Sequence, residues 1–307
     1  MSSSLPAYST IYAFGDSLSD AGNISLLSSI AGSALPVSPP YYQEHYGFLS
    51  AAVFSNGPVW VQDLSLALGL GTLKPSLDGG HDFAYGGAQT GPTPQNAHDP
   101  IIQAVSLPAQ LTEFEAEVGK PSADALYTLS IGSNDVLAIL RTPGLTPQQQ
   151  AADVSAAVAD EVSFVKSLIA HGATNVLVLN LPDLGKTPDV TSGAADGTHI
   201  PSAALVGEAS QLSSAYDAAL ASQLAAVGPA VHVADLYHLL DNAVADPAAY
   251  GLSNVTAPVW SGNFSSASSG SLAATGTAQG QYLFWDQLHP TETGQLAIAA
   301  AAEPLLG

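Results

Sequence analysis

Short, almost wholly apolar segments alternate along this chain with longer segments in which apolar residues recur every three or four positions. The short segments at 10–14, 126–131, 176–181 and 231–233 have the composition of strands buried on both faces, and a weaker strand is predicted at 282–285. Strands that alternate with helices form a parallel sheet covered by helices on both faces. The alternation therefore predicts an α/β fold.

The longer segments are predicted helices. Apolar residues keep to one helical face in each of three of them, 107–118, 154–169 and 205–224. Thr146 followed by Pro147 is typical of a helix start, so the second of these helices is expected to begin there.

Two stretches interrupt the alternation. Residues 30–58 are rich in Pro, Tyr and Ser, and residues 253–280 contain 19 Ser, Gly, Ala or Thr among 28. We expect both to be long loops, which either form a lid or pocket wall at the rim of the sheet or are plain surface excursions. One continuous α/β domain can reach 307 residues, so a single domain over 1–307 is expected.

Charge excludes several classes of partner. The chain carries 26 Asp and Glu against 5 Lys and Arg, a net charge of −21. Nucleic acid and anionic membrane surfaces require the opposite sign, so we expect neither as a partner. The scarcity of cations suits an acidic extracellular or periplasmic setting, and plain solubility accounts for it equally well.

The absence of Cys excludes disulfides, thiolate metal sites and a cysteine nucleophile. No apolar run reaches the length of a transmembrane helix, so no transmembrane segment is predicted. We expect a secreted or periplasmic protein whose signal peptide is absent from this sequence, and a cytoplasmic location stays open. The sequence does not predict the oligomeric state.

Ser17 is a candidate nucleophile. It follows Gly15 and Asp16 at the end of the first predicted strand, which places its hydroxyl at a helix N-terminus on the carboxyl edge of the sheet. Backbone N–H groups and the helix dipole at such a position stabilise an oxyanion. Taken alone, the segment fits a helix cap better than a nucleophile.

A carboxylate and an imidazole lie three residues apart near the end of the chain. Asp286 can hold the Nδ1–H of His289 within one tight turn, which leaves Nε2 free as a base. Pro290 is then expected to start the last helix. By itself, this spacing is usually an ordinary surface turn.

Two further segments offer hydrogen-bond donors. Residues 83–88 are predicted as a strand that runs into Gly86 and Gly87, where a backbone N–H can approach a ligand closely. Residues 131–135 are similar and add the side-chain amide of Asn134. Each segment in isolation is also typical of a turn that ends a strand.

In this order, the four segments resemble those of the GDSL, or SGNH, hydrolase family: Gly-Asp-Ser-Leu, a Gly turn, Gly-x-Asn-Asp and Asp-x-x-His. The resemblance covers about residues 11–299, and 54–60 and 180–185 are similar to further stretches of the larger bacterial and plant lipase-esterase branch. It implies a three-layer, doubly wound, flavodoxin-like fold with a mostly parallel sheet and helices on both faces.

The resemblance also implies a mechanism without a cofactor. Ser17 is implied as the nucleophile of an acyl-enzyme pathway, His289 as its base and Asp286 as the group that orients the base. The implied substrates are small-molecule, lipid or acylated-sugar esters. An acyltransferase that passes the acyl group to an alcohol or lipid stays open, as does a catalytically silent binding protein. Because His289 must be neutral to act as base, activity is expected to rise towards neutral or alkaline pH.

The implied oxyanion hole consists of the N–H of Ser17, the N–H of Gly86 and the amide of Asn134, with Gly87 as second choice for the glycine. Two features depart from the branch: residues 43–53 look like an insertion, and 253–280 lacks a cysteine pair.

No metal is expected. Nearby polar residues favour capping and hydrogen bonding over metal ligation; they are Asp16, Asp20, Asn23 and Asp135. The remaining histidines show no paired ligand spacing; they are His45, His81, His98, His171, His199, His232 and His238.

Overall fold

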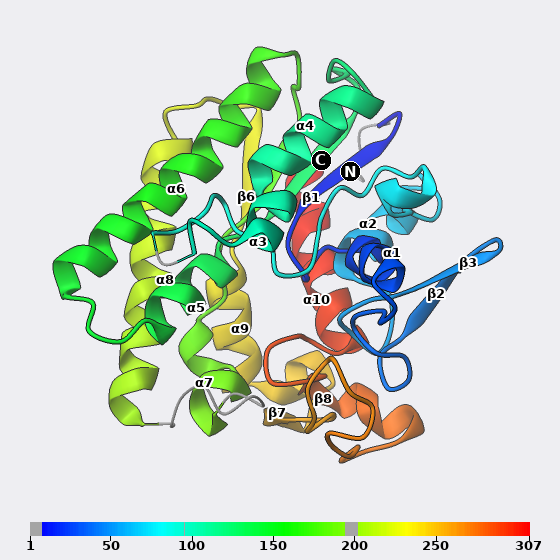
Figure 1. Cartoon of the computed structure of the whole chain (residues 1–307), viewed down its shortest axis with the longest axis vertical. Helices are drawn as coiled ribbons and strands as arrows, with labels where there is room; N and C mark the ends of the chain where they lie inside the picture. The colour runs from blue at the N-terminus through cyan, green and yellow to red at the C-terminus, as the bar shows by residue number, and fades with distance from the viewer. Residues whose placement is uncertain (1–7, 95, 194–201) are drawn as a thin grey trace.

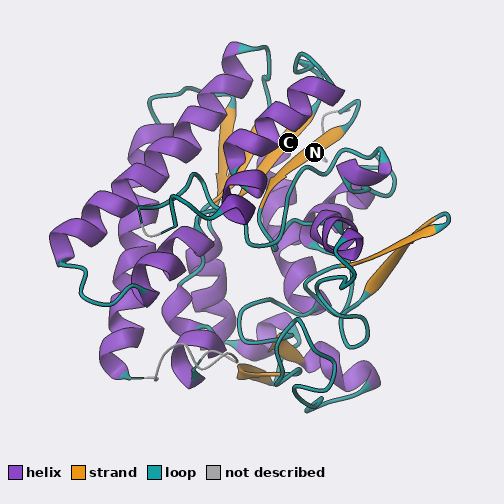
Figure 2. Cartoon of the chain, in the orientation of Figure 1, coloured by secondary structure: helices purple, strands orange, loops and turns teal. Residues whose placement is uncertain are grey.

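Strands and helices alternate through the chain, as the apolar pattern predicts. The computed structural model describes residues 8–94, 96–193 and 202–307 (Figures 1 and 2). The strands are β1 (Ile11–Gly15), β2 (Gln43–Tyr46), β3 (Leu49–Ala52), β4 (Leu126–Ser130), β5 (Val176–Leu179), β6 (Val231–Ala234), β7 (Asn254–Pro258) and β8 (Tyr282–Phe284). The α-helices are α1 (Asn23–Ile30), α2 (Trp60–Ala67), α3 (Pro100–Val105), α4 (Leu107–Glu117), α5 (Ser133–Arg141), α6 (Pro147–Ala170), α7 (Pro188–Ser192), α8 (Ala203–Leu224), α9 (Leu236–Ala245) and α10 (Glu292–Ala302).

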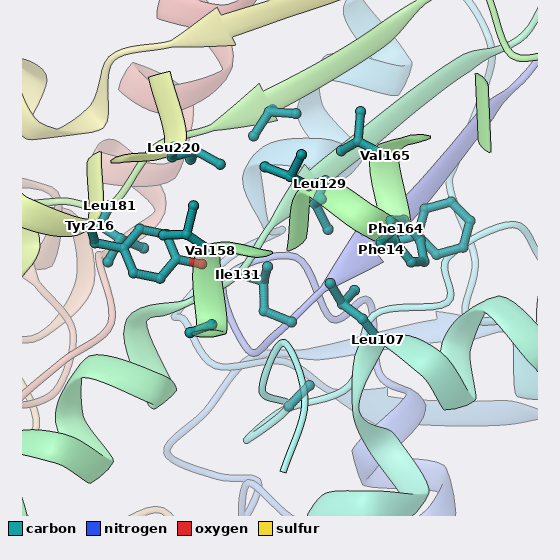
Figure 3. Packing of buried hydrophobic residues seen from close by; sticks show 14 of the residues in the cluster. Phe14, Leu107, Leu129, Ile131, Val158, Phe164, Val165, Leu181, Tyr216 and Leu220 are labelled. Carbon is teal, nitrogen blue, oxygen red and sulfur yellow. The ribbon is translucent and has the colours of Figure 1, made fainter. Parts of the chain in front are cut away.

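Four strands form the central parallel sheet in the order β1-β4-β5-β6. Alternate residues of each strand enter two separate apolar cores. Tyr12 and Phe14 of β1 pack in the core beneath α4, α6 and α8, part of which Figure 3 shows, whereas Ile11 and Ala13 face the core beneath α2, α9 and α10. The expected α/β fold with helices on both faces is confirmed.

Residues 81–85 lie along the outer edge of β1. Ala13 N–H donates to His81 O (3.0 Å), and the N–H groups of Phe83 and Tyr85 donate to the carbonyls of Ala13 (2.7 Å) and Gly15 (3.1 Å). The hydrogen bonds have the spacing of a parallel pair, although the segment forms only an isolated bridge at Asp82 rather than the predicted strand. With this segment counted, the order becomes 2-1-3-4-5, the flavodoxin-like order.

Helix ends follow local capping chemistry. Thr146 accepts a hydrogen bond from Gln149 N–H and Pro147 occupies the first turn of α6, as expected. The last helix differs from the prediction, because α10 begins at Glu292 and not at Pro290. Thr291 is its N-cap, with its hydroxyl accepting from Gly294 N–H.

The two predicted loops contain strands. Within 30–58, β2 and β3 pair antiparallel and form a hairpin that projects from the body of the molecule (Figure 1). Within 253–280, β7 pairs in parallel with β8, which therefore belongs to a separate two-stranded sheet and not to the central one. The apolar composition of β8 is explained by the small core that it shares with α9.

None of the helices in the described part of the chain combines the length and apolar character needed to span a bilayer.

Candidate active site

Ser17 lies in a tight turn directly after β1, and its side chain is buried. The N–H groups of Ser19 and Asp20 both donate to Asp16 O, which closes a single turn that does not continue as a helix. The first helix, α1, begins only at Asn23. The prediction that Ser17 occupies a helix N-terminus is therefore wrong, because Asp20 caps α1 in its place through its side chain.

Three side chains from the two ends of the chain meet at this turn. Ser17 Oγ lies 2.8 Å from His289 Nε2, although the residues are 272 positions apart in the sequence. His289 Nδ1 lies 2.8 Å from Asp286 Oδ2 and 3.0 Å from Oδ1. A carboxylate only accepts, so Nδ1 carries the proton and Nε2 is left to accept from the Ser17 hydroxyl.

Asp286 is held by donors on both oxygens. Oδ1 accepts from the N–H groups of Leu288 (2.8 Å) and His289 (2.7 Å), and Oδ2 accepts from the hydroxyl of Tyr41 (2.6 Å). Burial by itself raises the pKa of Asp286, but the neighbouring His289 charge and these hydrogen bonds outweigh burial and hold the pKa below its ordinary value. Asp286 therefore stays ionised beside His289.

The candidate oxyanion donors are not all available. Gly86 N–H donates to Asp20 Oδ2 (2.7 Å), which contradicts the expectation that it is free to face a ligand. The N–H groups of Ser17 and Gly87 have no hydrogen-bond acceptor among the described residues. Asn134 uses one amide hydrogen on Ala88 O (2.9 Å) and keeps the other.

Asn134 lies in the first turn of α5, directly after Gly132. The backbone of Gly132 has φ +105°, and a Cβ there would lie 2.5 Å from the hydroxyl oxygen of Tyr216. Only glycine fits this junction between β4 and α5. The N-terminal end of α5 lines the same cavity as Ser17, so its positive dipole acts on the site.

A family comparison identifies the class of protein. The model described as GDSL-like Lipase/Acylhydrolase matches residues 11–302. The chain belongs to this family. As a GDSL hydrolase it is an enzyme that cleaves acyl esters, so the expected class of enzyme is confirmed.

Curated relatives of this GDSL hydrolase occur in bacteria and plants. The phosphatidylcholine-sterol acyltransferase of Aeromonas hydrophila is 29% identical over 97% of this chain and 90% of its own length. Esterase EstA of Pseudomonas aeruginosa is also 29% identical over 97% of this chain, but this chain spans only 47% of EstA. A GDSL esterase/lipase of Arabidopsis thaliana is 28% identical over 95% of this chain and 89% of its own length.

The polar residues around the site of this GDSL hydrolase are hydrogen-bonded, as expected. Asp20 accepts from the N–H groups of Gly22, Asn23, Ile24 and Gly86. Asn23 donates to Asp82 O and Ala84 O, and Asp135 accepts from Thr90. No group of three or more His, Cys, Asp or Glu that could hold a metal occurs within the described residues.

Sequence patterns missed two residues that support the site. The Tyr41 hydroxyl contacts Asp286, and the Phe54 ring packs on the His289 imidazole with 4.8 Å between ring centroids. Both residues come from the Pro-rich and Tyr-rich stretch before α2, where no periodic pattern indicates which aromatic side chain turns inward. Phe54 lies in the stretch 54–60 that is similar to the lipase-esterase branch, but no sequence pattern predicts its contact with the His289 imidazole.

Two hollows open from the reacting atoms of this GDSL hydrolase. One is a narrow cavity of about 100 Å³ between α9, α10 and β8, with a mostly apolar lining. The other is an open cleft of about 590 Å³ whose lining includes Gly87, Gln89 and Arg141. Ser17 and His289 border both.

Proposed function

We propose that this chain is a serine esterase in which Ser17 is the nucleophile, His289 the general base and Asp286 the group that orients and stabilises His289. The observation that supports the proposal most is the continuous contact from Ser17 Oγ to His289 Nε2 and from His289 Nδ1 to Asp286. A hydroxyl is a weak nucleophile until an adjacent base takes its proton, and these contacts supply that base.

The proposed reaction has two steps. Ser17 Oγ attacks the ester carbonyl carbon while its proton passes to His289 Nε2, and the resulting tetrahedral intermediate breaks its bond to the alcohol oxygen, which takes the proton from His289. Water then attacks the acyl-enzyme, gives a proton to His289 and releases the carboxylic acid. Ser17 Oγ recovers its proton from His289, which completes the cycle.

The oxyanion that forms in each step needs donors that are not already used. We propose the N–H groups of Ser17 and Gly87 and the Nδ2–H of Asn134, with Gly87 in place of Gly86 because Asp20 occupies the Gly86 N–H. Gly87, Ser17 and Asn134 line the same cleft. Preorganised donors of this kind often make the largest single contribution to such catalysis.

Labelling with a fluorophosphonate probe and ester hydrolysis test this proposal together. Wild type is expected to be labelled and active, and Ser17→Ala to lose both the label and turnover while it stays folded. Ser163→Ala, a change of the same kind on the exposed face of α6, serves as the matched control and should behave as wild type. Full activity of Ser17→Ala, or no labelling of folded wild type, contradicts the proposal; the second result favours a silent binding protein.

A second candidate, acyl transfer to an alcohol, is favoured by the Aeromonas relative, whose name describes an acyltransferase. The acyl-enzyme is common to both reactions, and only the second acceptor differs. Product analysis with an added alcohol separates the two: an ester of that alcohol indicates transfer, and free acid alone indicates hydrolysis.

The proposal includes small-molecule, lipid or acylated-sugar esters as substrates and a location outside the cytoplasm. The scarcity of Lys and Arg supports an acidic setting. The raised pKa of several buried carboxyl groups supports it too; burial raises the pKa of Asp16, for example, to about 6. Fractionation of the source cells tests the location.

A further inference from the structure

The reacting atoms lie on the boundary between two hollows of different character. The narrow cavity and the open cleft have in common Ser17, Asn134, Leu288 and His289. An ester bound at Ser17 has two parts that extend in different directions from the carbonyl carbon. Each hollow is therefore positioned to hold one part.

The narrow cavity is suited to an apolar chain. Away from Ser17 most of its wall is aliphatic or aromatic and comes from α9, α10 and the segment around β8, which pack against one another. Representative lining residues are Leu236, Leu239, Leu240, Ala243, Leu252 and Phe284. A charged or strongly hydrated group would lose its water there without compensation.

The open cleft is suited to the group that must leave. Its lining is mixed: apolar side chains such as Phe54 and Phe264 lie beside the polar side chains of Gln89, Asn96 and Arg141. After the first step the alcohol must diffuse away and water must enter, whereas the acyl group stays bonded to Ser17 Oγ. The wider cleft therefore suits the alcohol and the incoming water, and the narrower apolar cavity suits the acyl group.

We propose that the cavity between α9, α10 and β8 binds the acyl chain and limits it to a short chain, while the cleft binds the alcohol. This assignment rests on the proposed esterase function. An apolar cavity of about 150 Å³ holds a benzene ring, so a cavity of about 100 Å³ admits a chain of about four carbons. Esters of short-chain fatty acids are thus the preferred substrate class.

A series of esters with one alcohol and acyl groups from acetyl to decanoyl tests the cavity. In wild type, kcat/KM is expected to rise by roughly fourfold per methylene up to about butanoyl and then to fall, because each buried methylene adds a similar increment of binding. Ala243→Leu adds an isopropyl group to the cavity wall. It is expected to lower kcat/KM for butanoyl esters on the order of tenfold relative to acetyl esters.

Ala138→Leu is the matched control, since Ala138 lines only the open cleft. Ala138→Leu should leave the dependence of kcat/KM on acyl length unchanged. A second series of esters keeps the acyl group constant and varies the alcohol, and Ala138→Leu should alter the kcat/KM values in that series. Leu240→Ala enlarges the cavity and should move the acyl optimum to longer chains. It also provides the test if Ala243→Leu does not fold.

The assignment is overturned if Ala243→Leu or Leu240→Ala changes the alcohol profile and not the acyl profile, or changes neither. Failure of the esterase proposal looks different: wild type then hydrolyses no member of either series, or Ser17→Ala hydrolyses them as fast as wild type. Thermal unfolding and turnover of the acetyl ester show whether each variant is folded.

Discussion

Hydrogen bonds to single atoms decide which residues of this site can act. The Gly86 and Gly87 amides are neighbours, yet Asp20 takes only the Gly86 N–H. The pairing of Asp286 with His289 was predictable only from the four segments in their order, because the three-residue spacing by itself is typical of a surface turn. The hydrogen bond from Gly86 N–H to Asp20 was not predictable. It joins residues 66 positions apart in the sequence, and no local pattern indicates such a contact.

Asn134→Ala removes one proposed oxyanion donor. We expect kcat to fall about a hundred- to a thousandfold with a much smaller change in KM, because the donor acts on charge that develops in the transition state. Steady-state kinetics on a short-chain ester measure both parameters. A variant as fast as wild type removes Asn134 from the oxyanion hole.

Tyr41→Phe removes the hydroxyl that contacts Asp286 Oδ2. That hydrogen bond helps to lower the pKa of Asp286, so its loss raises this pKa. We expect kcat to fall several-fold and the acid limb of the pH-rate profile to move to higher pH.

Tyr42→Phe is the neighbouring control, because its hydroxyl contacts Glu44 Oε2 instead (2.9 Å). It should leave the pH-rate profile in place. A uniform loss of rate in Tyr41→Phe, with no shift of the acid limb, would assign Tyr41 a packing role only.

At the scale of elements, the junction between β1 and the Ser17 turn is fixed by close contact with β4. Gly15 has φ +137°, and a Cβ there would lie 2.0 Å from Ser130 O. Gln110 of α4 holds the same residue, since it accepts from Gly15 N–H and donates to Gly15 O. No flexible side chain is available to move aside, so the junction requires glycine.

Gly15→Ala is expected to lower the free energy of unfolding by several kcal/mol, roughly the effect of strained backbone together with an overpacked core. Gly207→Ala on α8, where a Cβ meets nothing within 4 Å, should instead stabilise the protein by about 1 kcal/mol. Denaturant unfolding of both variants measures the difference. Equal stabilities contradict the close packing at Gly15.

The central strands were predictable because they are apolar on both faces, and the long helices because their apolar stripes keep one period. The hairpin of β2 and β3 was not. Its residues Gln43, Glu44 and His45 are polar and largely outward-facing, so the stretch resembles a loop in composition. The placement of β8 outside the central sheet depends on pairing with β7, which composition does not encode.

At the scale of the whole molecule, acids outnumber basic residues, and several Asp and Glu side chains are buried whereas no described Lys or Arg is. Burial raises the pKa of Asp16 to about 6, of Asp135 to about 7 and of Glu161 to about 8. The folded protein thus keeps protons that the unfolded chain, with carboxyl pKa values near 4, has already released. The free energy of unfolding therefore falls as pH rises from about 4 to about 8.

We expect the melting temperature to be several degrees lower at pH 8 than at pH 5, since about 1 kcal/mol corresponds to roughly 2 °C in a protein of this size. Repulsion within a chain of net charge −21 acts in the same direction. Glu161→Gln, which keeps a neutral group of similar shape opposite Tyr216, should flatten the dependence. A melting temperature that rises from pH 5 to pH 8 contradicts this account.

The proposed mechanism places the opposite demand on pH, because in it His289 must be neutral when it accepts the proton from Ser17. Rate is thus expected to increase over the same interval in which thermal stability decreases.

The separation of Ser17 and His289 along the chain has a consequence for biosynthesis. Ser17 is translated long before His289, so a nascent chain holds the proposed nucleophile without its proposed base. On the proposed mechanism, a chain that stops before residue 286 lacks both partners of Ser17 and is expected to hydrolyse no ester.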